Sequence, residues 1–193
     1  MSEIKKVFIC CIIVFILSAV RVYSINSKEY YPIELKYKLN ECVSLEGDFF
    51  NSINEKMDGY FITVLGTEII PIEDFIKTYE ALDTDYFNNQ DYVYLVTANF
   101  NNVSNELNQE AGINLDEYII QNGAYINYIE RDVFSYVNDF DSYRFCLSPN
   151  TEKKVVIPFT ISEQFINIDE FQNGEPQLVV SLYPHKKVVS LID

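Results

Sequence analysis

Side chains alternate most regularly over residues 91–106, which read DYVYLVTANFNNVSNE. Successive residues from Tyr92 to Phe100 point to opposite sides, and β-branched or aromatic residues fill both sides as far as Val96. That pattern is typical of a β-strand with both faces buried. The short amides of Asn101-Asn102 favour a turn. We therefore expect a central strand of a two-layer β structure that ends at these asparagines.

Shorter segments elsewhere show the same period of two and are separated by turn-forming residues. They comprise residues 33–39, 41–45, 60–65, 119–129, 142–147, 154–161, 177–183 and 187–192. Residues 33–39 alternate between apolar and charged side chains, which predicts a strand with one face in solvent. Gly66 is expected to form a bulge, after which residues 68–70 extend the preceding strand.

Three hairpins are expected between these segments. Asn122-Gly123, flanked by apolar residues, indicates a two-residue type I′ turn, because that turn needs positive φ at both central positions. The loop Ser148–Lys153 predicts pairing of residues 142–147 with residues 154–161. Pro184-His185 predicts pairing of the last two strands.

Helical spacing replaces the alternation in residues 71–82, PIEDFIKTYEAL, where Pro71 suits the first helical position. One face of this helix would carry Ile72, Phe75, Ile76, Tyr79 and Leu82. Residues 130–137 predict a second short helix. Ser162 is a candidate N-cap for a third short helix or for a 3₁₀ turn, because its hydroxyl can accept from a free backbone N–H.

In total the pattern predicts eight or nine short strands and two or three short helices, with neighbouring strands joined by turns. This favours a mainly β fold, an antiparallel β-sandwich, over a parallel sheet, because strands and helices do not alternate regularly. The 193 residues suffice for one domain and a short appendage. We place the domain at residues 25–193, with residues 25–32 as a short tether.

The first 24 residues, MSEIKKVFICCIIVFILSAVRVYS, form a segment of different character. Lys5-Lys6 precede the apolar run Val7–Val20, as in an export signal. As a helix these 14 residues would reach only about 21 Å, short of a ~30 Å hydrocarbon core. Residues 4–25 would reach roughly 33 Å if the flanking basic side chains snorkel.

Two fates of residues 1–24 stay open. As a signal-anchor, the segment would be a single transmembrane helix in the cell membrane, with the C-terminal domain outside the cytoplasm, because basic residues precede it. As a signal peptide, it would be removed near Ser24, since Val22 and Ser24 partly match the small-residue cleavage pattern. The domain would then be secreted.

Acidic residues dominate the rest of the chain, and the whole protein has a formal net charge of −15. Of the 29 acidic and 14 basic residues, Glu3, Lys5, Lys6 and Arg21 precede Ile25, which leaves 28 acidic and 11 basic residues beyond Ser24. Such a surface repels nucleic acid, because it has no excess of Lys or Arg to replace condensed counterions. The charge either provides solubility alone or attracts a cation or a basic partner.

Several stretches carry a family resemblance: YVYLVTANFNNVSNE, LNECVSLEGDFF (39–50), DGYFITVLGTEII (58–70), VVIPFTISEQFI (155–166) and LYPHKKVVSLI (182–192). Together they resemble uncharacterised bacterial membrane-anchored extracytoplasmic proteins with an immunoglobulin-like β-sandwich domain. The resemblance implies an immunoglobulin-like domain of the cell envelope. It implies no activity and no functional residues. The chain departs from true immunoglobulin domains in having no Trp.

His185 is the only histidine, so any Ser-His-Asp or Cys-His catalytic set would have to use it. It lies in a predicted hairpin turn beside Lys186 and Lys187, which is a poor place for a desolvated base. We expect a surface turn residue there. The chain also lacks C-x₂-C spacing, so no zinc site is expected.

Carboxylates at Asp83, Asp85 and Asp91, and at Asp139 and Asp141, have spacings that calcium sites use. Neither group has the glycine and distal glutamate of a calcium loop, so solvated surface charge is the simpler interpretation. A pair of carboxylates for glycoside hydrolysis would not be visible in sequence spacing. Asn102-Val103-Ser104 matches a glycosylation acceptor, but Asn102 is also well suited to capping a turn.

Cys42 and Cys146 are the two cysteines beyond the N-terminal segment. They would pair as a disulfide in an oxidising compartment or remain two buried thiols, and the sequence leaves both open.

We therefore expect a non-enzymatic, membrane-tethered interaction module outside the cytoplasm, with no catalytic, cofactor or metal residues and no cofactor. Its partners would be the membrane, through the N-terminal helix, and an unidentified protein or envelope component, but not nucleic acid. The alternative is an extracytoplasmic protein that binds a small ligand or a cation such as Ca²⁺.

Overall fold

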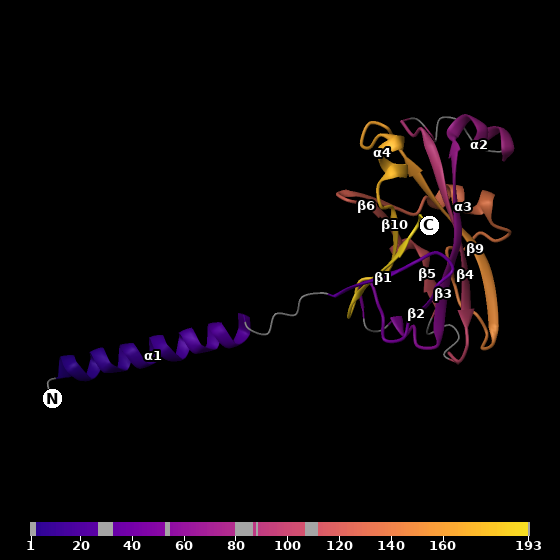
Figure 1. The fold of residues 1–193 in the computed structure, drawn as a ribbon. Coiled ribbons are helices and arrows are strands. Elements are labelled where there is room, and N and C mark those ends of the chain that lie inside the picture. Colours follow the sequence, from indigo (N-terminus) through magenta and orange to yellow (C-terminus); the bar gives the residue numbers. More distant parts are fainter. Residues whose placement is uncertain are drawn as a thin grey trace. The chain divides into compact units, whose positions relative to one another are not determined.

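The computed structural model describes residues 3–26, 33–52, 55–79, 87, 89–106 and 112–192. The chain divides into two compact units, residues 1–32 and residues 33–193. In the first unit a single helix, α1, spans Glu3–Asn26 (Figure 1). No helix among the described residues combines the length and the apolar composition needed to cross a membrane. The helix itself is confirmed, and its role as an anchor or signal stays a prediction.

In the second unit one sheet has four strands in the order β2-β3-β4-β9 (Figure 1). These strands are β2 (Cys42–Ser44), β3 (Tyr60–Pro71), β4 (Tyr92–Asn102) and β9 (Thr151–Ile161). The expected central strand is confirmed, since β4 pairs antiparallel with β3 and β9 along its whole length. The expected bulge is also present, because the pairing of β3 shifts between Val64 and Gly66.

The predicted end of β4 is wrong by two residues. Asn101 and Asn102 still pair with both neighbouring strands. The turn follows them, and the buried Asn102 side chain forms it: its Oδ1 accepts from Asn105 N at 2.7 Å, and its Nδ2 donates to Asn105 O at 2.8 Å. Asn102 is thus the last residue of β4, and its side-chain amide closes the turn that follows.

The two faces of β4 are buried in different clusters. Tyr94, Val96, Ala98 and Phe100 lie in the main core. Val93 and Leu95 lie on the opposite face, in a second cluster with α2 (Ile72–Thr78) and α3 (Arg131–Val137). Both helices were expected, although α2 is shorter than the predicted residues 71–82, of which residues 80–82 lie outside the described part of the chain.

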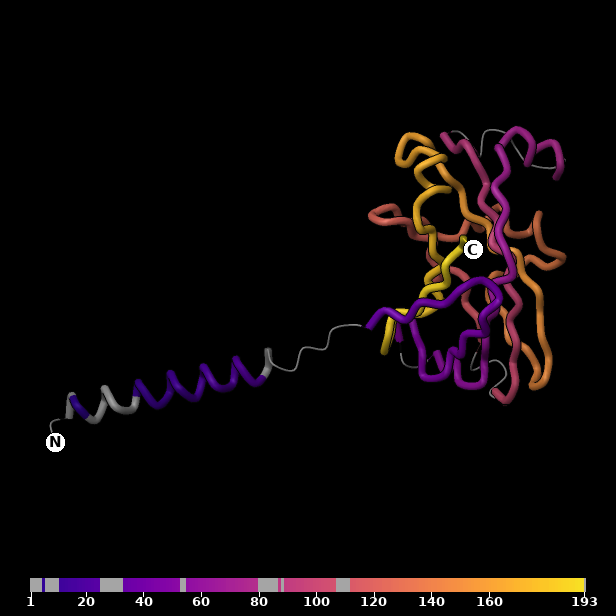
Figure 2. The backbone as a smooth tube through the Cα atoms, viewed as in Figure 1, coloured from indigo at the N-terminus to yellow at the C-terminus, as the bar shows by residue number. Residues whose placement is uncertain are grey.

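The other large sheet has five strands in the order β1-β11-β10-β6-β7. They are β1 (Glu34–Tyr37), β11 (Lys186–Ser190), β10 (Gln177–Ser181), β6 (Ile119–Asn122) and β7 (Tyr125–Tyr128). Residues from both sheets fill the main core. The mainly β architecture with antiparallel sheets is therefore confirmed, with one exception: β1 pairs parallel with β11, at the opposite end of the domain sequence (Figure 2).

Two of the three expected hairpins form. β10 pairs antiparallel with β11, and β6 pairs antiparallel with β7. The turn between β6 and β7 differs from the prediction: Asn122 pairs with Tyr125, so Gly123 and Ala124 are the loop residues. Only Gly123 of these two has a positive φ, at 58°, which is the pattern of a type II′ turn with glycine first.

The third expected hairpin, residues 142–147 with residues 154–161, is wrong. β8 (Arg144–Phe145) pairs with β5 (Ile113–Asn114), while β9 pairs with β4. The chain does turn between β8 and β9, but each of the two strands pairs with a strand that is farther away in the sequence. A short 3₁₀ helix, Leu115–Glu117, follows β5.

After Ser162 the structure has a turn, one of the two expected alternatives, and no helix: Gln164 N donates to Ser162 Oγ at 3.4 Å, and Phe165 N donates to Ser162 O at 3.0 Å. Residues 163–165 form a turn, and helix α4 (Ile168–Asn173) begins later. Asn167 caps it, because its side chain accepts from the backbone N–H of Asp169 and of Glu170. The chain therefore makes an extra turn between β9 and α4.

The outer edge of β9 is closed by groups from other elements. Val156 exchanges two hydrogen bonds with the Asn138 side chain, and Pro158 O accepts from Glu130 N at 2.8 Å. Pro158 itself lacks an N–H, which a strand tolerates where the missing donor would face an open edge. Thr160 O accepts from Asn127 and Tyr125. Because Asn127 and Tyr125 belong to β7, the closure at Thr160 also holds β7 next to the end of β9.

Candidate functional site

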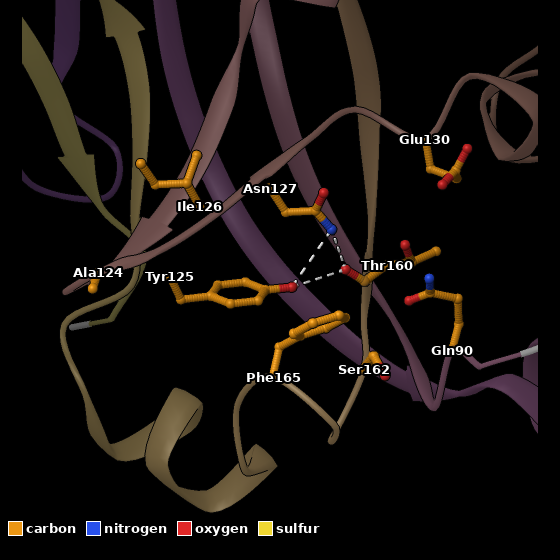
Figure 3. A pocket seen from close by; sticks show the side chains of 9 residues that line it. All are labelled: Gln90, Ala124, Tyr125, Ile126, Asn127, Glu130, Thr160, Ser162 and Phe165. Atoms are coloured by element: carbon orange, nitrogen blue, oxygen red, sulfur yellow. Dashed lines mark hydrogen bonds between the residues drawn. The ribbon is translucent and has the colours of Figure 1, made fainter.

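A pocket of about 600 Å³ lies where β7 approaches the end of β9 (Figure 3). We name it the β7 groove. Its lining residues come from the β6–β7 hairpin, the end of β9, the following turn and the residue before Asp91: Gln90, Ala124, Tyr125, Ile126, Asn127, Glu130, Thr160, Ser162 and Phe165.

The floor of the β7 groove is polar and held by main-chain hydrogen bonds. Asn127 Nδ2 donates to Thr160 O at 2.5 Å, and Tyr125 OH donates to the same carbonyl at 3.3 Å. Burial raises the pKa of the Tyr125 hydroxyl above its ordinary value of 10, so the group stays a neutral donor. On its far side the Tyr125 ring packs edge-on against Phe171, which anchors it to α4. The floor is therefore rigid.

The rim of the groove carries Phe165, whose side chain is 80% exposed. Figure 3 shows its ring pointing toward Tyr125. The turn that holds Phe165 is well tied: Phe165 N donates to Ser162 O at 3.0 Å, and Glu163 N donates to Asp91 Oδ2 at 2.7 Å. An exposed phenylalanine beside a pocket is a candidate contact for a ligand, because aromatic residues are enriched in binding surfaces.

Strand β7 forms an edge of the five-stranded sheet. In a hairpin with a two-residue loop, the residues next to the loop form a hydrogen-bonded pair, and the pairs then alternate. Tyr125 and Asn127 therefore bond to β6, whereas the main-chain groups of Ile126 and Tyr128 face away from it. The side chains of these two residues are 55% and 57% exposed.

Charge around the groove is negative. Glu130 lines it, Asp91 and Glu163 lie beside it, and none of its nine lining residues is Lys or Arg. The neighbouring Arg131 is engaged elsewhere, since its Nε binds Asp116 at 2.7 Å and its guanidinium lies 5.2 Å from the Tyr143 ring centroid. The arrangement suits a ligand that is apolar in part and not negatively charged.

The structure places His185 at the tip of the β10–β11 hairpin, half-buried rather than in solvent. Its Nδ1 is buried and has no hydrogen-bond partner among the described residues. It lies near a buried ion pair, in which Lys187 Nζ is 2.5 Å from Asp48 Oδ2 and also donates to Ser44 O at 2.6 Å. Lys187 thus gives the buried Asp48 carboxylate a cation, and this cluster joins the hairpin to residues 44–48.

The carboxylates with calcium-like spacing are not brought together in the described chain. Asp83 and Asp85 lie outside the described residues, and Asp91, Asp139 and Asp141 are exposed. Within the described part, no three His, Cys, Asp or Glu residues are grouped so that they could hold a metal ion. Cys42 and Cys146 are both free and exposed, so neither alternative from the sequence holds: they form no disulfide, and the thiols are not buried.

Sequence reasoning missed the β7 groove. The sequence places Phe165 in a short helix or 3₁₀ turn and gives no sign that its side chain is exposed. Ile126 and Tyr128 were interpreted simply as members of a hairpin. The one usable signal is the polar character of Asn127 and Gln121 between apolar residues, which hints at a strand near an edge.

Comparison with known proteins identifies the family of the chain. Residues 34–187 match the model of the family described as Domain of unknown function (DUF5028). The chain belongs to this family. The β7 groove lies within the DUF5028 region of the chain. No curated protein matches the sequence.

Two solved structures are similar to the chain. One is a functionally unknown protein from Listeria monocytogenes EGD-e, with 12% identity and a TM-score of 0.42 over 63% of this chain and 66% of that one. This chain thus spans just under two thirds of the Listeria protein. The other is an uncharacterized beta-sandwich protein from Clostridium difficile 630, with 12% identity and a TM-score of 0.44 over 86% of this chain and 99% of that one.

Proposed function

We propose that this DUF5028 protein is a membrane-tethered, non-enzymatic interaction module that works outside the cytoplasm and contacts its partner through the β7 groove. The observation that carries the proposal is Phe165, which is 80% exposed at the rim of a rigid polar floor. Leaving a phenylalanine in water forfeits roughly 1.5–3 kcal/mol of burial energy, so a partner that covers it gains affinity.

The tethering part of the proposal rests on the first 24 residues. Lys5-Lys6 precede the apolar run, and the 24-residue helix α1 would be about 36 Å long at 1.5 Å per residue. We propose that it serves as a single-pass signal-anchor in a bacterial cell envelope, with cleavage near Ser24 as the alternative. An immunoglobulin-like character of the β domain belongs to the same proposal.

The non-enzymatic part rests on how the titratable groups are used. His185 lies beside the buried Asp48–Lys187 ion pair, away from the lining of the β7 groove. The groove itself offers amides, hydroxyls and one carboxylate, which orient a ligand but supply no activated nucleophile. We expect binding without chemistry.

Labelling with a membrane-impermeant maleimide tests the location. Cys42 and Cys146 are exposed thiols in the domain, so intact cells should be labelled, and the Cys42→Ser, Cys146→Ser double variant should lose that label. Labelling that requires cell lysis would contradict an extracytoplasmic domain. Deleting residues 3–24 should move the protein out of the membrane fraction.

Photo-crosslinking tests the contact surface. A benzophenone amino acid at position 165 should give a discrete covalent adduct in cells, whereas the same amino acid at Val103 should not. Val103 is a suitable control, because it is also exposed, at 46%, but does not line the groove. Equal adducts at both positions, or none at either, would contradict the proposed surface.

A small-molecule receptor is the second candidate function. The volume of about 600 Å³ falls within the usual range of small-ligand pockets. A cation is the third ligand class to test. Asp83 and Asp85, whose spacing is one that calcium sites use, lie outside the described residues, so the structure does not test them as ligands. A rise in melting temperature with Ca²⁺ that a chelator reverses would favour this receptor function over a protein partner.

A further inference from the structure

We propose that the β7 groove accepts an extended, positively charged peptide segment of a partner protein, which adds to β7 as a further strand of the five-stranded sheet. The inference deepens the proposed function and depends on it, because it names the class of partner for the same surface.

The main chain of β7 presents the pattern that an added strand needs. Tyr125 and Asn127 bond to β6, so the N–H and C=O groups of Ile126 and the C=O of Tyr128 face the open edge. Tyr128 N is taken by the Asn127 side chain, whose Oδ1 accepts it at 2.8 Å. Among the described residues the N–H and C=O of Ile126 have no main-chain partner, so together they form one complete docking point for a peptide main chain.

Of the other edges in the described sheets, those of β9 and β2 are closed or shorter. Strand β1, at the opposite edge of the five-stranded sheet, has four residues like β7, but it carries the exposed Lys36 and so suits a basic segment less. The outer edge of β9 is closed at Val156, Pro158 and Thr160 by Asn138, Glu130 and Asn127. Strand β2 has three residues, and β7 has four. Edge strands are usually covered or blunted because they attract other chains, so an open edge with apolar exposed side chains needs an explanation.

Side chains around β7 match alternate positions of an added strand. Ile126 and Tyr128 project from one face of β7, and both are more than half exposed. Phe165 stands on the side of Tyr125 and Asn127, as Figure 3 shows. Since successive residues of a strand point to opposite faces, one apolar residue of the peptide would reach Phe165, and its neighbours would lie beside Ile126 and Tyr128.

Charge selects the partner. The groove is lined by Glu130 and flanked by Asp91 and Glu163, with no Lys or Arg in its lining. The whole chain has a net charge of −15, which disfavours a second copy as the added strand and favours a lysine- or arginine-bearing segment. A basic peptide would also associate faster at low salt than at high salt.

Fluorescence anisotropy with the full chain in a non-ionic detergent tests the inference. The probes are three labelled decapeptides of alternating residues: lysine with valine, glutamate with valine, and the lysine peptide with every second amide N-methylated. The lysine peptide should bind with a dissociation constant below about 1 mM, and the other two at least about tenfold more weakly. Binding should also weaken as salt rises.

Variants assign the binding to β7. Ile126→Pro removes an N–H that faces away from β6 and should weaken binding of the lysine peptide at least about tenfold. Phe165→Ser should weaken it as well, while Val103→Ser, an exposed apolar control outside the groove, should leave it unchanged. The β6–β7 pairing in Ile126→Pro is checked by its far-ultraviolet circular dichroism and melting temperature. If that variant does not fold, the N-methylated peptide carries the same test.

Three outcomes would overturn the inference: absence of lysine-peptide binding, equal binding of the glutamate peptide, or binding that N-methylation leaves unchanged. A soluble oligosaccharide that binds at Phe165 in place of the peptide would assign the groove to a glycan. Concentration-dependent dimers abolished by Ile126→Pro would assign the edge to a second copy. In each case an adduct at position 165 in cells would still support the proposed function, so the two failures are distinguishable.

Discussion

Asn138 pairs with Val156 as a neighbouring strand would. Its Nδ2 donates to Val156 O at 2.8 Å, and its Oδ1 accepts from Val156 N at 2.9 Å. The same Nδ2 also donates to Phe134 O at 3.0 Å, so one side chain both ends α3 and closes the edge of β9. Two backbone groups that would otherwise invite another chain are thereby occupied.

Replacing Asn138 with Ala should destabilise the domain and make it self-associate. Two hydrogen bonds to Val156 disappear, and we expect a loss of about 1–3 kcal/mol in the free energy of unfolding. Chemical unfolding measures the loss, and light scattering measures the association. The matched control is Asn99→Ala, because Asn99 makes only an exposed side-chain hydrogen bond with Glu152. The control should change stability by less than about 0.5 kcal/mol.

Breaking the Asp48–Lys187 ion pair from either side should be costly. The two side chains are only 4% and 11% exposed, so Lys187→Met leaves a buried carboxylate without its cation, and Asp48→Asn leaves a buried ammonium. We expect each change to cost about 3–5 kcal/mol. The double variant should lose less than the sum of the two, because it buries no unpaired charge. Additive losses in this double-mutant cycle would show that the pair is not coupled.

The pH dependence of stability should carry the signature of Asp48. Burial, only partly offset by Lys187, raises the pKa of this carboxyl in the folded protein above its ordinary 3.8. Its contribution to stability is therefore complete below the unfolded pKa and is lost as pH rises through the folded pKa. Unfolding curves of the wild type and of Asp48→Asn between about pH 3 and pH 7 should diverge over that window.

Glu34 should behave in the opposite way. A hydrogen bond from Lys186 Nζ at 2.8 Å holds the pKa of Glu34 below its ordinary 4.5. Its contribution is present above the unfolded pKa and is lost as pH falls through the folded value. Glu34→Gln should thus lower stability at neutral pH and have no effect in strong acid. Nuclear magnetic resonance titration of the two carboxyls would give their pKa values directly, and an unshifted Glu34 would contradict the pairing.

Gly59→Ala should be far more harmful than Gly47→Ala. Both glycines have positive φ, 83° and 69°. A Cβ at Gly59 would lie 2.7 Å from Ser104 Oγ and 2.8 Å from Asn105 N, whereas a Cβ at Gly47 would meet nothing within 4 Å. Both variants carry the backbone penalty of roughly 1 kcal/mol, so the difference between their melting temperatures isolates the close approach at the Asn102 turn. Equal losses of melting temperature would mean that the residues of the Asn102 turn move aside at no cost.

The local pattern of side chains predicted most of the strands but few of the pairings between them. β4 was identified as central because both its faces are apolar, and the bulge at Gly66 was identified because a glycine interrupts the alternation. Period two cannot say which strand lies alongside, and so the β8–β9 hairpin was wrong and the parallel pairing of β1 with β11 was not foreseen. Both depend on contacts between residues far apart in the chain.

The candidate site was harder to predict than the fold. A groove arises where the ends of β7 and β9 meet, and neither segment signals the other in sequence. Asn138, Asn127 and Pro158 occupy positions that local propensity treats as breaks, yet in the structure they close an edge. Phe165 follows a serine and two polar residues that resemble a helix start, and only the later cap at Asn167 shows that it lies in a turn.

The order of strands also has a mechanical consequence. β1, the first strand after the N-terminal unit, and β7 lie at opposite margins of the same sheet. If α1 is fixed in a membrane and a partner binds β7, a pulling force between them acts across the strands. Each pair of neighbouring strands from β1 to β7 then bears that force in turn. The ladder with the least resistance then sets the force at which the connection fails. For β1, whose four residues share with β11 the one parallel pairing in the described sheets, rupture would release the strand as extra length of tether, while the covalent chain and the contact with the partner stay intact.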